Sequence, residues 1–164
     1  MVRSAPRVAA LGALLLILGA CVPICGIGAK FSVSNAHVDS NYNCPYPSEN
    51  RPYDVHATID ASNTLSNTVT IKSIAENDEL VNTVGAWEGP KTAKGSGAIK
   101  DYSPKSVGSG SNATIKFSVP FQCTNTGPSA TTYGEFTFKF TLTTSAGTYT
   151  ISAGDRHRLS FPSS

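Results

Sequence analysis

Four cysteines have the most distinctive chemistry in this chain of 164 residues, and they fall into two pairs. Cys21 and Cys25 lie inside an apolar run near the start, whereas Cys44 and Cys123 lie in the polar remainder. The first pair could serve a lipid anchor or a disulfide, or could simply pack within a membrane. The segment around the first pair therefore bears on where the protein resides.

Residues 1 to 29 have the order of an export signal. Arg3 and Arg7 precede an apolar stretch from Val8 to Ala29, and no acidic residue occurs among them. A positive flank favours the cytoplasmic side of a membrane, so everything downstream is expected to cross it.

Three fates fit this segment. The sequence LGAC, which ends at Cys21, resembles a bacterial lipobox; that resemblance implies cleavage before Cys21 and lipidation of its side chain. The apolar stretch is also long enough to remain as a signal-anchor helix, since about 20 residues span a bilayer core. Alternatively, cleavage near Ala29 would release the protein. All three fates place the domain outside the cytoplasmic membrane.

The second cysteine pair favours the same location. In an oxidising compartment Cys44 and Cys123 can form a disulfide. The loop closed in this way has about 80 residues, and closing it stabilises the fold by about 4 kcal/mol in the chain-entropy model. The alternative is that both are isolated buried thiols.

The remaining side chains give no spacing typical of catalysis. His37, His56 and His157 fall on separate elements and form no metal-binding motif, and His56 is expected to face solvent. No nucleophile elbow or phosphate loop occurs. Asp78 and Glu79 are adjacent, so on a strand they would point to opposite faces. We therefore expect no catalytic residue, no metal and no cofactor, and the sequence GDRHRL (154–159) is interpreted as a charged turn and edge strand.

Aromatic residues in the predicted loops suggest a binding surface instead. A sugar ring could stack on a platform made by four of them, which are Tyr42, Tyr46, Tyr53 and Trp87. The alternative is that these rings pack over the end of the domain.

The charge distribution argues against a nucleic-acid partner. The formal net charge is +2, but Arg3, Arg7 and Lys30 belong to or adjoin the export segment. Without these three cations, ten Lys and Arg remain against eleven Asp and Glu. No basic cluster remains to attract phosphates.

The elements that must position these residues read as β-strands. Apolar and polar residues alternate over 53–60, 68–74, 113–121 and 135–144, and two shorter strands are expected near the C-terminus. Residues 79–88 are apolar but less regular, which favours a bulge or bend at Gly85. We predict an all-β antiparallel sandwich of seven or eight strands over residues 53–164, a linker or edge strand over 30–52, and an N-terminal apolar signal or anchor helix over 1–29.

Two segments resemble immunoglobulin-like modules of bacterial surface proteins: SPKSVGSGSNATIKFSVPF (103–121) and FTLTTSAGTYTIS (140–152). In that fold the strands at 53–60 and 113–121 are antiparallel neighbours, so Cys44 and Cys123 would reach the same end of the sandwich. The disulfide would then clip the segment before the first strand to its sheet without crossing the core.

These observations favour a non-enzymatic β-sandwich module of the cell surface or envelope with a structural, adhesion or protein-interaction role. The alternative is a module that binds carbohydrate or another small solute, and the third possibility is an envelope hydrolase. The expected partners are the membrane, through the N-terminal anchor, and a protein or glycan at the cell surface. The domain is expected to be membrane-anchored on the extracytoplasmic side, or secreted.

Overall fold

The computed structural model describes residues 28–45, 50–87, 93–123 and 132–161, and within them the chain forms only β-strands, turns and connecting segments. Eleven strands follow one another in the described residues: β1 (Phe31–Val38), β2 (Asn41–Asn43), β3 (Pro52–Asn63), β4 (Val69–Val84), β5 (Lys94–Ile99), β6 (Tyr102–Ser103), β7 (Ser106–Val107), β8 (Ser111–Gln122), β9 (Thr132–Thr144), β10 (Gly147–Ser152) and β11 (His157–Phe161).

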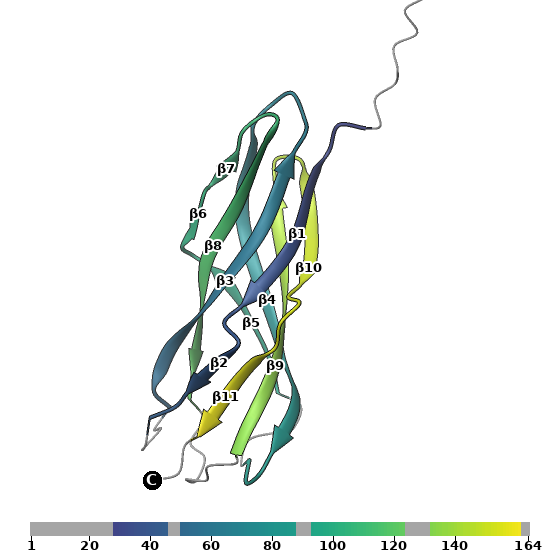
Figure 1. Ribbon diagram of the computed structural model, residues 1–164. Helices are drawn as coiled ribbons and strands as arrows, with labels where there is room; N and C mark the ends of the chain where they lie inside the picture. Colours follow the sequence, from purple (N-terminus) through teal and green to yellow (C-terminus); the bar gives the residue numbers. More distant parts are fainter. Residues whose placement is uncertain (1–27, 46–49, 88–92, 124–131, 162–164) are drawn as a thin grey trace, which may run out of the picture.

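The strands form two layers (Figure 1). One sheet has the order β1-β3-β8-β6, and the other has the order β2-β11-β9-β4-β5, with β10 paired to β9 and β7 paired to β4. The central pair of the first sheet, β3 and β8, is antiparallel along its whole length, from Pro52 opposite Gln122 to Asn63 opposite Ser111. The predicted all-β fold and the predicted pairing of these two strands are confirmed.

Period-2 alternation fixes which side chains enter the core. Every second residue is buried along β9, which includes Phe136 to Leu142, in β3 from Val55 onward, and in β8 from Ile115 to Val119. Phe117 of the first sheet meets Phe140 of the second edge to face, with ring centroids 5.0 Å apart. Since each buried aromatic ring removes about 150–250 Å² from water, these rings supply much of the burial that joins the sheets.

The number of strands differs from the predicted seven or eight. The additional strands in the described residues are β2, β6 and β7, which have two or three residues each. Segments this short contain too few residues for alternation to show. One of them changes the reading of GDRHRL: β11 pairs with β9 on one side and with β2 on the other, so it is not the edge strand that we expected.

The predicted N-terminal anchor helix and Cys21 fall outside the described residues, as does Cys25. Among the residues described, none forms a helix long and apolar enough to span a bilayer. The first described strand, β1, pairs with β3 as an outer strand of the four-stranded sheet.

Asn63, at the end of β3, is a fully buried polar residue that holds the connecting loops together. Its side-chain nitrogen lies 2.9–3.0 Å from the carbonyl oxygens of Asn67, Val107 and Gly108, and its Oδ1 accepts from the amide of Leu65 at 3.1 Å. The side chain therefore satisfies several backbone groups that would otherwise be buried without partners.

We expect Asn63→Ala to lower the free energy of unfolding by about 2–3 kcal/mol, because it removes the donor and acceptor while leaving those backbone groups in place. Urea denaturation measures the change. The matched control is Asn112→Ala on β8, where the exposed side chain is expected to contribute less than about 0.5 kcal/mol. Equal losses in the two variants would contradict the structural role assigned to Asn63.

Candidate functional site

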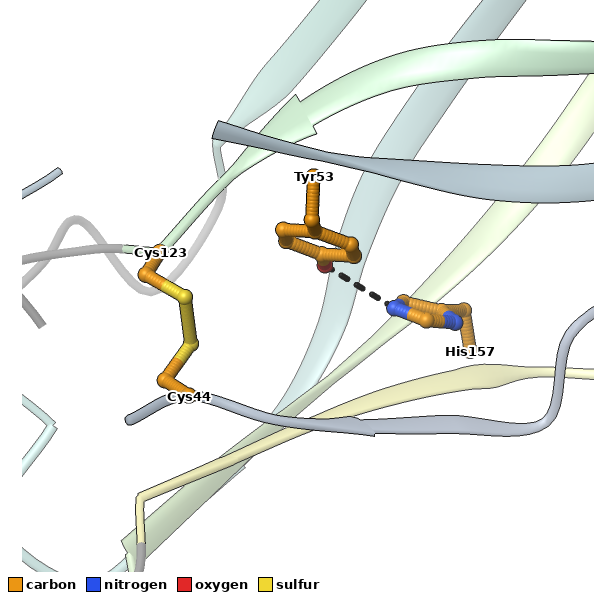
Figure 2. Close-up of a disulfide and its surroundings, with 4 residues drawn as sticks. All are labelled: Cys44, Tyr53, Cys123 and His157. Carbon is orange, nitrogen blue, oxygen red and sulfur yellow. Dashed lines mark hydrogen bonds between the residues drawn. A yellow bond between two sulfur atoms is a disulfide. The ribbon is translucent and has the colours of Figure 1, made fainter. Parts of the chain in front are cut away.

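The disulfide lies at one end of the sandwich, as the sequence predicted. Cys44 and Cys123 are bonded, their Cα atoms are 5.9 Å apart, and both are at most 1 % exposed (Figure 2). The pairing is compatible with a location outside the cytoplasm, because disulfides persist in oxidising compartments.

The two cysteines belong to different sheets, which corrects the expected clip within one sheet. The amide of Cys44 donates to the carbonyl of Ser160 on β11, at 2.9 Å, and Cys44 follows β2. Cys123 follows β8, and its amide donates to the carbonyl of Arg51, also at 2.9 Å. The disulfide therefore bridges the two sheets at their end. The difference arises because Asn41–Asn43 joins the second sheet through three residues without alternation.

The structure brings together two members of the predicted aromatic platform. Tyr42 and Tyr53 stack face to face, with ring centroids 3.9 Å apart and an interplanar angle of 4°. Each ring covers one face of the other, and the edge of Tyr53 also meets Phe121 at 5.7 Å. Tyr42 comes from β2 and Tyr53 from β3, so this stack also links the two sheets. Tyr46 falls outside the described residues.

Trp87, the fourth member, makes different ring contacts. Its half-buried indole packs edge-on against Phe136 and Phe161, with centroids 6.3 and 5.8 Å away. The ring also lies against Gly134, where a Cβ atom would come within 2.6 Å of the indole. Phe136 in turn contacts Phe121 at 5.0 Å. Trp87 is therefore connected to Tyr53 through Phe136 and Phe121, and the two rings do not stack side by side in one open platform.

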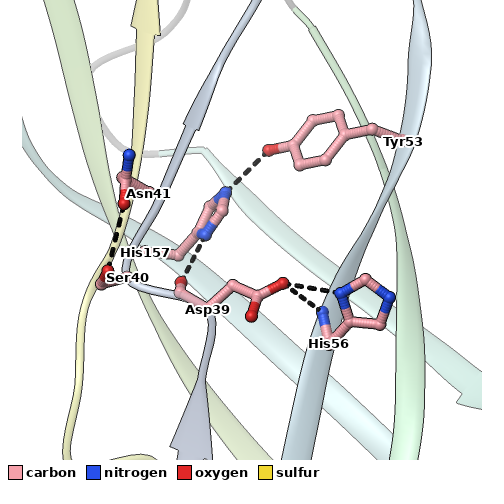
Figure 3. Close-up of polar contacts among 6 residues, drawn as sticks. All are labelled: Asp39, Ser40, Asn41, Tyr53, His56 and His157. Atoms are coloured by element: carbon pink, nitrogen blue, oxygen red, sulfur yellow. Dashed lines mark hydrogen bonds and ion pairs between the residues drawn. The ribbon is translucent and has the colours of Figure 1, made fainter.

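A buried hydrogen-bonded chain runs beside the disulfide (Figures 2 and 3). His157 is 1 % exposed, its Nδ1 lies 2.6 Å from the carbonyl oxygen of Asp39, and its Nε2 lies 2.9 Å from the hydroxyl of Tyr53. A carbonyl oxygen only accepts, so Nδ1 carries the proton and Nε2 accepts from Tyr53. Both ring nitrogens are therefore occupied by protein groups, and neither is free to act as a base or a metal ligand.

Burial accounts for the charge states in this chain. It lowers the pKa of His157, against the opposing effect of the bond to Asp39, and it raises the pKa of Tyr53, so both side chains are neutral near pH 7. The burial of His157 corrects the interpretation of GDRHRL as a purely charged turn. The two arginines do match that interpretation, because Arg156 and Arg158 are exposed and pair with Glu135 at 3.3 and 2.8 Å.

The carboxylate of Asp39 faces away from His157 and holds His56. Its Oδ2 accepts from the backbone amide of His56 at 3.0 Å and lies 2.8 Å from the ring Nδ1 (Figure 3). Partial burial acts to raise the pKa of Asp39, but the hydrogen bonds from His56 outweigh it and the pKa is lowered. His56 faces solvent, as the strand alternation predicted.

We expect Tyr53→Phe to lower the free energy of unfolding by about 1–3 kcal/mol, because Nε2 of His157 would stay buried without its donor. Urea denaturation at pH 7.5 measures the change. Tyr149→Phe is the control, since the hydroxyl of Tyr149 donates to the Ala146 carbonyl at the surface, at 3.3 Å. If both variants lost the same small amount, the buried bond to His157 would have no special energetic role.

A groove of about 550 Å³ opens at this same end, between β4 and β5 of one sheet and β8 of the other. Its apolar wall includes Pro52, Trp87 and Phe121, and its polar groups include Glu76 and Asp78. Within the described part of the chain, Trp87 Nε1 and Glu76 Oε2 are buried atoms without a hydrogen-bond partner. Buried polar atoms without partners are uncommon in proteins. Here the indole N–H of Trp87 lacks an acceptor and the carboxylate oxygen of Glu76 lacks a donor.

The two carboxylates belong to the core-facing row of β4. That row reads Ile74, Glu76, Asp78 and Leu80, and Glu76 is only 6 % exposed. The opposite residues on β5 are glycines: Gly97 faces Glu76 and Gly95 faces Asp78. A Cβ at Gly97 would lie 2.9 Å from Glu76 Oε1, and one at Gly95 would collide with Asp78 Oδ1. The glycines therefore leave room for the carboxylates.

Burial makes these carboxylates costly to ionise. Burial, together with the neighbouring Asp78, raises the pKa of Glu76 to about 7. Burial also raises the pKa of Asp78, although the backbone amide of Gly95 donates to its carboxylate and opposes the shift. Sequence reasoning paired Asp78 with Glu79 and missed Glu76; Glu79 instead faces outward and pairs with Lys94 at 3.1 Å. The described residues contain no group of three or more His, Cys, Asp or Glu placed to hold a metal.

Comparison with known proteins gives similarity in structure only. No protein-family model matches the sequence, and no curated protein matches it. A Northeast Structural Genomics Consortium target is similar with 13% identity, 82% of this chain and 87% of that chain covered, and a TM-score of 0.40. The putative ApaA protein of Bordetella pertussis has 13% identity, coverage of 83% and 97%, and a TM-score of 0.35. PapD-like domain 7 of human CEP192 has 13% identity, coverage of 97% and 98%, and a TM-score of 0.30.

Proposed function

We propose that this chain is an exported, non-enzymatic binding module with an immunoglobulin-like β-sandwich, and that it takes a small ligand in the groove lined by Glu76, Asp78 and Trp87. The observation that carries the proposal is that Glu76 and Trp87, which line one largely apolar groove, each have a buried polar atom, Oε2 and Nε1, without a hydrogen-bond partner among the described residues. Keeping these atoms unpaired costs stability, and a ligand that hydrogen-bonds to both would recover that cost.

The strand order supports the immunoglobulin-like type. The order β1-β3-β8-β6 corresponds to strands A-B-E-D of that fold, and β11-β9-β4-β5 corresponds to G-F-C with one further strand. Binding sites of sandwiches commonly lie at one end, where connecting segments cluster. The groove has such a position.

The position of the groove also suits an exported protein held by its N-terminus. Phe31, at the start of β1, pairs with Asn63, whereas the groove residue Pro52 lies at the other end of β3. The two positions are 11 residues apart along the strand, or roughly 35 Å. Figure 1 shows that β1 starts at the end of the sandwich opposite the ends of β8 and β11. An anchor at the N-terminus would thus hold the groove away from the membrane.

We expect no hydrolytic activity, although two carboxylates line the groove. Glycoside hydrolases place their two carboxyl groups on either side of the bond that breaks. Glu76 and Asp78 project from the same face of one strand, so both approach a ligand from one side. An arrangement of this kind suits recognition better than acid–base chemistry.

The binding proposal is tested by mapping amide chemical shifts on the full chain with a panel of neutral saccharides, dipeptides, alkylamines, alkanols and carboxylates. We expect at least one class to shift the amides of Glu76, Trp87 and Phe121. Ala93→Phe, which fills the groove, should abolish the shifts, whereas Ala98→Phe on the exposed side of β5 should leave them unchanged. A panel without any groove-specific shift would overturn the proposed function.

An adhesion or assembly role is the second candidate, favoured by the elongated two-sheet shape (Figure 1). Pro52 and Gln122, which line the groove, lie at the end of β3 and β8 opposite the start of β1. A photoreactive residue at Gln122, beside the groove, should then crosslink to a surface protein, whereas the same residue at Thr70 should not. Equal crosslinking from both positions, or none from either, would count against this role.

A further inference from the structure

The groove has the charge of a cation site. Glu76 and Asp78 line it, and the cationic residue among the lining residues, Lys94, turns its Nζ to Glu79 on the outer side of the sheet, at 3.1 Å. The lining segments of β8 and β9 contribute Pro120, Phe121, Gln122 and Phe136, none of which titrates. The two carboxylates are therefore not neutralised by another side chain that lines the groove within the described residues.

Glu76 has an acceptor atom that no donor in the described residues satisfies. Glu76 is only 6 % exposed, and its Oε2 has no donor among the described residues. Gly95 and Gly97 leave room for the two carboxylates, because a side chain at either position would collide with a carboxylate oxygen. A buried acceptor without a donor destabilises the protein, and does so more strongly if it is charged.

The walls of the groove select among cations. Trp87, Phe121, Phe136 and two prolines give it a largely apolar surface, and aromatic faces attract organic cations. A divalent metal needs several oxygen ligands in a closed shell. The described residues offer only two carboxylates and no third acidic, histidine or cysteine ligand beside them. An organic cation with a carbon chain fits this combination of charge and apolar wall better than a metal ion does.

We propose that the groove binds a primary alkylammonium ion, whose N–H groups donate to Glu76 and Asp78 and whose carbon chain lies against Trp87 and Phe121. This inference rests on the proposed function and names the ligand class of that same groove. The ammonium supplies the missing donor to Glu76 Oε2, and an oxygen elsewhere on the ligand can accept from the Trp87 indole. The same chemistry occurs in a free amine and in a lysine side chain.

The single tryptophan of the chain provides the readout, because Trp87 lies in the groove wall. The full chain, with its disulfide intact, is titrated at pH 8 with n-pentylammonium chloride while Trp87 fluorescence and amide shifts are followed. We expect saturable binding, and at least tenfold weaker binding of n-pentanol, of pentanoate and of the quaternary pentyltrimethylammonium ion, which has no N–H group. Acetyl-lysine-methylamide with a free side-chain amine is titrated in parallel, and tighter binding than pentylammonium identifies a peptide lysine as the natural source.

Variants distinguish the effect of the two groove carboxylates on binding from the effect of negative charge elsewhere on the protein. Glu76→Gln and Asp78→Asn should each weaken pentylammonium binding at least tenfold, whereas Asp101→Asn, which removes an exposed negative charge outside the groove, should change it less than twofold. The affinity should also rise between pH 5.5 and 8, because the ammonium binds the ionised form of Glu76.

Several results would overturn the inference. Equal affinity for pentanol and pentylammonium, unchanged affinity in Glu76→Gln, or tighter binding of Ca²⁺ alone with the same shifts would each contradict an ammonium site. If a saccharide shifted the groove amides and the amines did not, the ligand class would be wrong and the proposed binding function would stand. If no compound of the panel shifted them, both would fall.

Discussion

Replacing both Cys44 and Cys123 by alanine is expected to lower the free energy of unfolding by about 4 kcal/mol. The two cysteines are 79 residues apart, and in the chain-entropy model a cross-link over such a loop removes a large part of the freedom of the unfolded chain. The bond also joins β2 of one sheet to the end of β8 in the other, so its loss frees the end of the sandwich at which the groove opens. A loss of this size corresponds to a fall in the melting temperature of roughly 10–20 °C.

Thermal and urea unfolding of the double variant, compared with the oxidised wild type, measure the effect. The reduced wild type is the matched control, because it has the native side chains without the cross-link, and it should lose a similar amount. A double variant as stable as the oxidised protein would contradict the bracing role. It would also weaken the argument for an exported protein, since the stabilisation is available only in an oxidising compartment.

The larger elements of the fold follow from the sequence because burial on one face imposes a period of two. β3, β8 and β9 have uninterrupted rows of apolar residues, such as Phe136 to Leu142, and the structure buries those rows. β2, β6 and β7 are too short for alternation to predict them. They are held by pairing with strands that are distant in sequence. Nothing local in Asn41–Asn43 indicates that β11 lies beside it.

The groove escaped prediction because of an irregularity near the start of β4. The apolar residues Val69 and Ile71 begin a row which, continued by twos, would reach Val81 and turn Glu76 to the solvent. A register shift between Ile71 and Ser73 moves the row by one residue, so Ile74 and Glu76 face the core and Val81 is 43 % exposed. A β-bulge of this kind reorients every side chain after it.

A trace of the groove is nevertheless present in the sequence. Gly95 and Gly97 lie two apart on β5, so their missing side chains fall on one face of the strand. Two glycines in such a position weaken a strand unless something must approach closely. The acidic residues that approach them are recognised only when the pairing of β4 with β5 is known. Residue types alone were therefore insufficient, and register was the missing information.

Replacing Glu76 by glutamine is expected to stabilise the protein above neutral pH. The pKa of Glu76 is about 7 in the folded protein against 4.5 ordinarily, so between these values the folded state binds more protons than the unfolded state. The stability that the protonated carboxyl contributes is complete below pH 4.5 and is lost as the pH rises through 7. Each pKa unit corresponds to 1.36 kcal/mol, so the wild type should lose about 3 kcal/mol over this range on account of Glu76.

Glutamine has nearly the same shape and does not titrate, so Glu76→Gln lacks this loss. The difference in unfolding free energy between Glu76→Gln and wild type should therefore grow by about 3 kcal/mol from pH 4 to pH 8, as measured by urea denaturation at each pH. His157 titrates in both proteins, and its contribution, which has the opposite sign because its pKa is lowered, cancels in the difference. Parallel stability curves for wild type and Glu76→Gln would mean that the carboxylate is ionised without cost, and the case for a groove that requires a cation would lose its energetic basis.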